Sequence, residues 1–220
     1  MFVILKRYFV IVDEKRQKTQ NSFMTALPKH DYTLEEYFEI ERNSEEKYEY
    51  FDGNIWSMAG ASPEHERIVV NIGGHLRELF RGRGCSVFGS NLKVKVPAYS
   101  PYRYPDLSVY CGKGIYETMD GLQVLMNPQM LIEVLSPSTE AFDRGEKFTY
   151  YKSIESLTEY ILIAVNRPHI TQFTKQNENE WIQREAIGLD SKLFLSTFEV
   201  EILLSEVYLD VEFPEPASEL

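Results

Sequence analysis

Two carboxylates in strand-like segments are the residues of this sequence best suited to chemistry. Glu133 interrupts the apolar run 130–135 (MLIEVL), and Asp106 follows Pro105 at the start of 104–111 (YPDLSVYC). Burying a carboxylate is costly unless a cation or hydrogen-bond donors compensate. Two carboxylates at the ends of adjacent strands can bracket a hard cation, such as Mg²⁺, that takes oxygen ligands. The alternatives are a Glu133 paired with a core lysine or arginine and an Asp106 that only begins a strand.

Lys147 is the third member of this set. Successive residues of a helix that begins near residue 141 are about 100° apart. Lys147 then lies in the middle of one face, which it shares with Asp143, Tyr150, Tyr151, Ile154 and Leu157. Lysines rarely occupy a packed face unless they are paired. The ammonium is therefore aimed at Asp106 and Glu133, or it forms a structural pair with Glu133.

Four further residues are candidates for a supporting role. His65 heads the apolar face of a helix and Glu49 begins a hairpin, and either could hydrogen-bond at the edge of the site. Tyr150 or Tyr151 could do the same from the Lys147 helix. The alternative for each of them is an ordinary place in the core.

The N-terminal elements begin with local signals. Thr33 and Glu36 form a capping box for a short helix within 31–43, and Asp52-Gly53 between two aromatic runs predicts a hairpin. Ser62-Pro63 begins a helix of about five turns, which the glycines at 82 and 84 end.

The later segments predict an α/β domain. Residues 85–96, 104–111, 130–135 and 159–165 have strand patterns, a helix is expected over about 140–156, and 168–174 with 181–186 form a second hairpin. The segment 130–135 is apolar on both sides, which is typical of a strand inside a covered sheet. The unit 130–165 implies a parallel pair of strands with a crossover. We expect a mixed central sheet flanked by helices, with an N-terminal helix–hairpin and a C-terminal hairpin.

The charge of the chain is unevenly distributed. The net charge is −11, yet residues 67–113 carry eight lysines and arginines against only Glu78 and Asp106. This stretch is either a solvated surface or a strip that faces phosphates. In the second interpretation the nucleic-acid-binding residues are Arg81, Arg83, Lys93 and Lys95.

The ends of the chain and its cysteines complete the expectations. The apolar residues 1–12 are interrupted by Lys6 and Arg7 and are too short to span a bilayer. We therefore expect an N-terminal extension (1–23), one domain (24–212), a tail (213–220), no membrane contact and a cytoplasmic location. Cys85 and Cys111 lack zinc-ligand neighbours, and two buried free thiols are favoured over one disulfide.

The segments YEYFDGNIWSMAGASPEHERI, YPDLSVY, IEVLSPSTEAFDRGEKFTYY and LTEYILIA resemble the Uma-two family of restriction-endonuclease-like proteins, from about Met24 to about residue 210. The resemblance implies a restriction-endonuclease-like fold of the PD-(D/E)xK superfamily. It places PD at Pro105-Asp106 and the second acidic residue at Glu133. The usual lysine position holds Leu135, and the resemblance implies that Lys147 replaces that lysine.

The expected function is that of an endonuclease dependent on Mg²⁺ or Mn²⁺. Asp106 and Glu133 would bind the metal, and Asp106, Glu133 and Lys147 would be catalytic. The expected partner is nucleic acid, with DNA favoured over RNA, and a homodimer is left open. The competing hypothesis is an inactive nucleic-acid-binding or protein-interaction module on the same fold.

Overall fold

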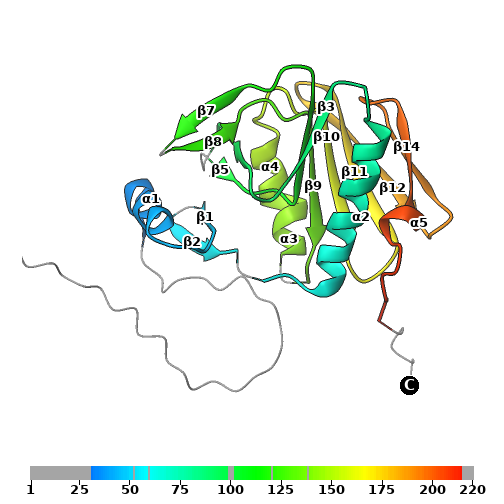
Figure 1. Ribbon diagram of the computed structural model, residues 1–220, viewed down its shortest axis with the longest axis horizontal. Coiled ribbons are helices and arrows are strands. Elements are labelled where there is room, and N and C mark those ends of the chain that lie inside the picture. The colour runs from blue at the N-terminus through cyan, green and yellow to red at the C-terminus, as the bar shows by residue number, and fades with distance from the viewer. Residues whose placement is uncertain are drawn as a thin grey trace, which may run out of the picture.

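The computed structural model describes residues 31–214 apart from 52, 59, 99–101, 120 and 138. The expected N-terminal extension and the last six residues of the expected tail lie outside the described residues. At the centre is a six-stranded sheet in the order β12-β11-β10-β9-β6-β3 (Figure 1). Its strands are β3 (Cys85–Gly89), β6 (Leu107–Cys111), β9 (Met130–Leu135), β10 (Glu159–Ala164), β11 (His169–Asn177) and β12 (Glu180–Ile187).

Strand direction makes this sheet mixed. β9 and β10 are parallel, whereas β6 pairs with β9 and β10 pairs with β11 in antiparallel fashion. Every residue of β9 and of β10 is buried, because both faces of the sheet are covered. The predicted parallel pair, the predicted hairpin of β11 and β12 and the α/β fold class are confirmed.

Helix α2 (Pro63–Leu79) covers one face of the sheet, and the segment from α3 (Glu140–Phe142) to α4 (Phe148–Tyr151) covers the other (Figure 1). Ser62 caps α2 as predicted, since its hydroxyl accepts a hydrogen bond from the main-chain N–H of His65. One core cluster contains Ile68, Ile72 and Leu76 of α2. The other contains Tyr151 of α4 and Leu131 of β9.

The helix expected over 140–156 is shorter and irregular. It consists of α3 (Glu140–Phe142), the π-helical turn η1 (Asp143–Lys147) and α4 (Phe148–Tyr151), and turns follow at residues 152–153 and 155–156. The predicted inward face is nevertheless correct, because Asp143, Lys147 and the other residues assigned to it are buried. π-helical turns are uncommon and occur often at functional sites.

The N-terminal unit lies at one side of the sheet (Figure 1). α1 (Leu34–Arg42) begins with the predicted capping box of Thr33 and Glu36. β1 (Tyr48–Phe51) and β2 (Asn54–Ser57) form the predicted hairpin.

Smaller elements surround the central sheet. A four-stranded sheet has the order β5-β4-β8-β7, with β4 (Lys93–Lys95), β5 (Tyr102–Arg103), β7 (Tyr116–Met119) and β8 (Leu122–Leu125). The C-terminal part adds the hairpin of β13 (Lys192–Leu195) and β14 (Val200–Leu203), followed by α5 (Leu204–Val207). No described helix has the length and hydropathy needed to cross a bilayer.

The strand-like stretch 85–96 contains two strands, β3 and β4, because the chain turns after Gly89 and β4 joins the smaller sheet. One expectation about this region is wrong. Cys85 and Cys111 are not free thiols, since they lie directly opposite each other on β3 and β6 and form a disulfide. Their cross-strand pairing depends on long-range register, which their spacing in the sequence did not reveal.

Candidate active site

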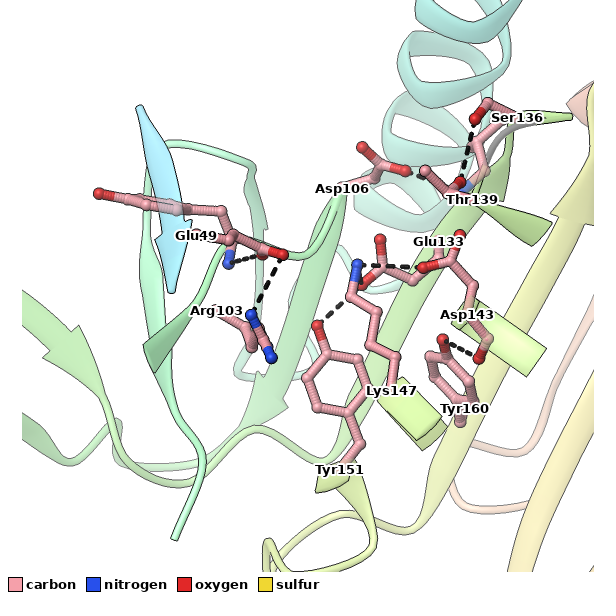
Figure 2. Close-up of polar contacts among 12 residues, drawn as sticks. Glu49, Arg103, Asp106, Glu133, Ser136, Thr139, Asp143, Lys147, Tyr151 and Tyr160 are labelled. Atoms are coloured by element: carbon pink, nitrogen blue, oxygen red, sulfur yellow. Dashed lines mark hydrogen bonds and ion pairs between the residues drawn. The ribbon is translucent and has the colours of Figure 1, made fainter. Parts of the chain in front are cut away.

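Strand register brings Asp106 and Glu133 together. In the antiparallel pair of β6 and β9, Leu107 lies opposite Ile132, so the next opposed positions are Asp106 and Glu133. Directly opposed residues of such a pair project from the same face of a sheet. Asp106 lies just before β6, so its carboxylate stands at the end of the sheet, close to the first turn of α2 (Figure 2).

Asp106 is held by groups from two other elements. Its Oδ2 accepts a hydrogen bond from the main-chain N–H of Val134 at 2.7 Å and lies 3.3 Å from Nε2 of His65. Burial lowers the pKa of His65, but the hydrogen bond to Asp106 and its negative charge outweigh burial and raise the pKa above its usual value. The structure thus places His65 against Asp106, and Asp106 retains Oδ1, to which no described residue donates a hydrogen bond.

Glu133 is a buried carboxylate with two donors on one oxygen. Its Oε1 accepts a hydrogen bond from the Tyr151 hydroxyl at 2.8 Å and lies 2.8 Å from Nζ of Lys147. Burial, helped by the negative charges of Asp106 and Asp143 and opposed by Lys147, raises the pKa of Glu133 to about 8. Among the described residues none donates to Oε2, so each of the two opposed carboxylates has one oxygen available for another ligand.

Lys147 bridges two carboxylates. Its Nζ lies 3.2 Å from Oδ1 of Asp143 in addition to its contact with Glu133, and all three side chains are at least 90% buried. Burial lowers the pKa of Lys147, but Glu133 and Asp143 outweigh it and raise the pKa well above the usual value. Lys147 is therefore an ammonium ion, which can donate hydrogen bonds and supply positive charge but cannot act as a base.

Asp143 received no role from the sequence, although it shares the inward face of the helix. The signal that could have revealed it is an acidic residue four positions before a buried lysine. Figure 2 shows Lys147 reaching toward Glu133 and Asp143, with the Tyr151 hydroxyl beside it. The tyrosine that contacts Glu133 is Tyr151, whereas Tyr150 packs its ring 5.2 Å from that of Phe51.

Glu49 forms a second buried ion pair beside this cluster (Figure 2). One of its carboxylate oxygens lies 3.5 Å from Arg103, and the other accepts a hydrogen bond from the main-chain N–H of Tyr104 at 3.0 Å. Glu49 lines the same cleft as Glu133 and Lys147. The structure thus brings Glu49 to the edge of the site, with a partner that the sequence did not indicate.

The four predicted nucleic-acid-binding residues do not form one strip. Arg81 is exposed and pairs with Glu78, and Arg83 donates a hydrogen bond to the carbonyl of Phe198. Both follow the C-terminal end of α2, a helix of about 25 Å whose first turn holds His65. Lys93 is buried against Glu41, and Lys95 is paired with Glu117. The structure therefore does not assemble these residues beside Asp106 and Glu133.

A cleft of about 880 Å³ opens over the carboxylates. Its lining includes the first turn of α2, the end of β9, the α3–η1 turn and residues 212–214. Seven of the lining residues are acidic and two are lysines. The chemistry of the cleft is thus dominated by carboxylate oxygens, which are ligands for hard cations.

The side chains of the cleft fit Mg²⁺ or Mn²⁺ only with help from other ligands. Nowhere in the described parts of the chain do three histidine, cysteine or acidic side chains converge as a complete metal centre. Mg²⁺ however is often bound by one or two carboxylates and completes its shell with waters and substrate phosphates. The available oxygens of Asp106 and Glu133 meet that smaller requirement.

Comparison with known proteins places the chain in a family. Residues 34–212 match the model of the Uma2 family, described as "putative restriction endonuclease". The uncharacterized Synechocystis protein slr1290 is 35% identical over 148 residues, which cover 67% of this chain and 76% of that protein. A second uncharacterized Synechocystis protein, sll1609, is 29% identical over 168 residues, which cover 76% and 94%.

A solved structure shares the fold. It is a crystal structure of "a putative nuclease belonging to DUF820" from Anabaena variabilis, with a TM-score of 0.64 and 16% identity, covering 80% of this chain and 97% of that one. This likeness confirms the fold expected from the resemblance to the Uma-two proteins. With the match over residues 34–212, it follows that this chain is a member of the Uma2 family of restriction-endonuclease-like proteins.

Proposed function

We propose that this protein is a metal-dependent endonuclease that hydrolyses phosphodiester bonds of nucleic acid. The observation that carries the proposal is the opposed pair of Asp106 and Glu133, each with an oxygen free of described donors, in a cleft beside a buried ammonium. The family description supports the same activity. Because that description names a restriction endonuclease, we expect DNA as the substrate in preference to RNA.

Asp106, Glu133 and the main-chain carbonyl of Val134 are the proposed ligands of Mg²⁺ or Mn²⁺. A divalent cation at such a site polarises a phosphoryl oxygen and makes a bound water more acidic. Tyr151 and Lys147 hold Oε1 of Glu133 and so fix the direction of its other oxygen. The Val134 amide fixes Asp106 in the same way.

Lys147 supplies a positive charge beside the proposed metal site. As an ammonium held by Asp143, it can donate a hydrogen bond to the attacking water or to a phosphate oxygen on which negative charge develops. His65 and Glu49 are proposed to support the site from its edge, the first through Asp106 and the second with Arg103.

A competing function follows from the same contacts. Lys147 already compensates Glu133 at 2.8 Å, which is what a purely structural ion pair would show. In that case the protein is an inactive nucleic-acid-binding or protein-interaction module, and the cleft needs no metal.

The test is cleavage of a panel of labelled DNA and RNA strands, single and paired, with Mg²⁺, with Mn²⁺ and with a chelator. We expect cleavage only with metal, and loss of cleavage in Asp106→Asn. Asp190→Asn, which changes an exposed aspartate in the turn before β13, is the matched control and should cleave normally. A panel left intact by the wild-type protein under all metal conditions would favour the inactive module.

A further inference from the structure

The charge around the cleft is unusual for a protein that binds a polyanion. Glu64 and Glu66 in the first turn of α2 and Glu212 near the end of the described chain line the cleft together with the inner carboxylates. Glu66 and Glu212 are exposed. Duplex DNA carries about one negative charge per 1.7 Å of its axis, and its binding depends on neutralising several phosphates with lysines and arginines.

Among the described residues, few cations line the cleft for that task. Apart from Lys147, the lysine that lines the cleft is Lys47, whose Nζ donates hydrogen bonds to the carbonyl and the hydroxyl of Ser90. The predicted basic residues lie elsewhere or are paired, as described above. A rigid duplex laid across this opening would therefore bring many phosphates close to carboxylates and few close to ammonium groups.

The walls of the cleft offer a different kind of contact. Phe142 from α3 and Phe213 from the segment after α5 both line it and are half-buried, and Met58 and Val165 add apolar surface. Phe142 is backed by the ring of Phe51 and Phe213 by that of Tyr208, at 5.7 and 5.5 Å. Supported aromatic rings of this kind can stack on bases of unpaired strands, whatever the sequence of the strand.

We propose that the substrate is unpaired nucleic acid, a single strand or a frayed end, and not an intact duplex. This inference rests on the proposed endonuclease function. One phosphate lies at the Asp106–Glu133 pair, and neighbouring bases stack on Phe142 and Phe213. A flexible strand can bring a single phosphate into the acidic cleft and turn the others away, which a duplex cannot do.

The first experiment compares binding without cleavage. A fluorescein-labelled DNA strand of mixed sequence and the same strand annealed to its complement are titrated with full-length protein in Ca²⁺, and gels verify that the DNA stays intact. Ca²⁺ takes the same oxygen ligands as Mg²⁺ with looser geometry. We expect the single strand to bind at least about fivefold more tightly, the lower end of what one stacked base contributes. Equal affinities, a preference for the duplex, or no binding of either would overturn the inference.

The second experiment tests the aromatic walls. Phe213→Leu and Phe142→Leu keep apolar packing but remove a stacking face, so each should weaken binding of the single strand about fivefold or more. Phe194→Leu is the matched control, because Phe194 is an exposed aromatic residue on β13 that does not line the cleft. Phe213→Trp should retain affinity, and single-stranded DNA should quench its indole fluorescence. If both leucine variants fold and bind normally, the bases do not stack on these rings.

The inference and the proposed function can fail separately. Equal cleavage of single-stranded and duplex DNA in Mg²⁺ would overturn the substrate class and leave the nuclease in place. Tight and selective binding of single strands without cleavage in any metal would uphold the binding preference and overturn the nuclease.

Discussion

At the scale of single residues, the candidate site depends on two buried carboxylates that share one ammonium and on a third, partly buried carboxylate beside them. Glu133 and Asp143 contact Lys147 directly, and Asp106 lies opposite Glu133 with the Val134 amide and His65 as its partners. A buried ion pair is not in itself evidence of added stability, because desolvation offsets the attraction between the charges. A cation bound at Asp106 and Glu133 would replace the proton that Glu133 holds below its pKa of about 8.

Replacement of Lys147 distinguishes a catalytic lysine from a structural one. Without metal, Lys147→Met leaves Glu133 and Asp143 without their cation and should cost about 3–5 kcal/mol of unfolding free energy. In saturating Mg²⁺ the metal should restore much of that stability, while the cleavage rate falls by about 10²–10⁴.

Thermal melts with and without Mg²⁺ and single-turnover rates measure both effects. Lys152→Met removes an exposed lysine just after α4 that contacts the Phe148 ring, so it should cost about 1 kcal/mol or less and leave the cleavage rate unchanged. A Lys147→Met protein that cleaves at the wild-type rate would exclude the proposed role of Lys147.

The raised pKa of Glu133 predicts how stability depends on pH. An unperturbed glutamate has a pKa of 4.5, whereas Glu133 in the folded protein has a pKa of about 8. Between these values the folded state holds a proton that the unfolded state has lost, so the stability contributed by Glu133 is complete below pH 4.5 and is lost as the pH rises through 8. The metal-free wild type should therefore lose stability relative to Glu133→Gln over that window.

Melting temperatures of the two proteins across this pH range, with a chelator present, provide the measurement. His65 also has a raised pKa and shifts stability in the same direction, but it is common to both proteins and cancels in the comparison. A difference between wild type and variant that does not change with pH would show that Glu133 is ionised throughout.

At the scale of elements, short sequence patterns correctly predicted the features that depend on a few neighbouring residues. The capping box at Thr33, the N-cap at Ser62 and the buried position of Lys147 each follow from a few neighbouring residues, and the structure has all three. The pattern of residues 85–96 predicted strands without placing the break between them, although Gly89, Ser90 and Asn91 are turn-forming residues that could have revealed it. The opposition of Asp106 to Glu133 needed the register of two strands that are distant in the sequence.

The alternating pattern of polar and apolar residues predicted the wrong environment for Lys93. Its position on the polar side of the 85–96 pattern predicted exposure, but α1 covers that side and buries Lys93 against Glu41. The rings of Tyr37, Tyr102 and Tyr104 surround the ammonium within 6 Å, which favours a cation. Lys93 therefore attaches α1 to β4, which is a structural role.

Two matched lysine variants test that attachment. Lys93→Met leaves Glu41 buried without its partner and should cost about 3–5 kcal/mol of unfolding free energy. Lys95→Met, on the same strand, removes a more exposed pair with Glu117 and should cost about 1 kcal/mol or less. Chemical denaturation measures both values, and equal losses would contradict the assignment of Lys93 to the packing of α1.

At the scale of the whole molecule, the break in the sequence pattern predicts that the domain begins after residue 23. The match covers residues 34–212, and the polar stretch that follows the apolar residues 1–12 precedes it. Deletion of residues 1–23 should accordingly leave the melting temperature nearly unchanged. A fall of more than about 5 °C, which corresponds to roughly 1 kcal/mol or more in a domain of this size, would show that the domain begins earlier.

The central claim is that Asp106 and Glu133 together hold a divalent cation, and binding of Mn²⁺ followed by electron paramagnetic resonance tests it without a substrate. The wild-type protein should bind Mn²⁺. Asp106→Asn and Glu133→Gln should each weaken this binding about tenfold or more, because each substitution removes one of the two carboxylate ligands. Asp190→Asn should bind like the wild type. Mn²⁺ affinities that are the same in all four proteins would contradict the account, because the opposed carboxylates would then hold no metal.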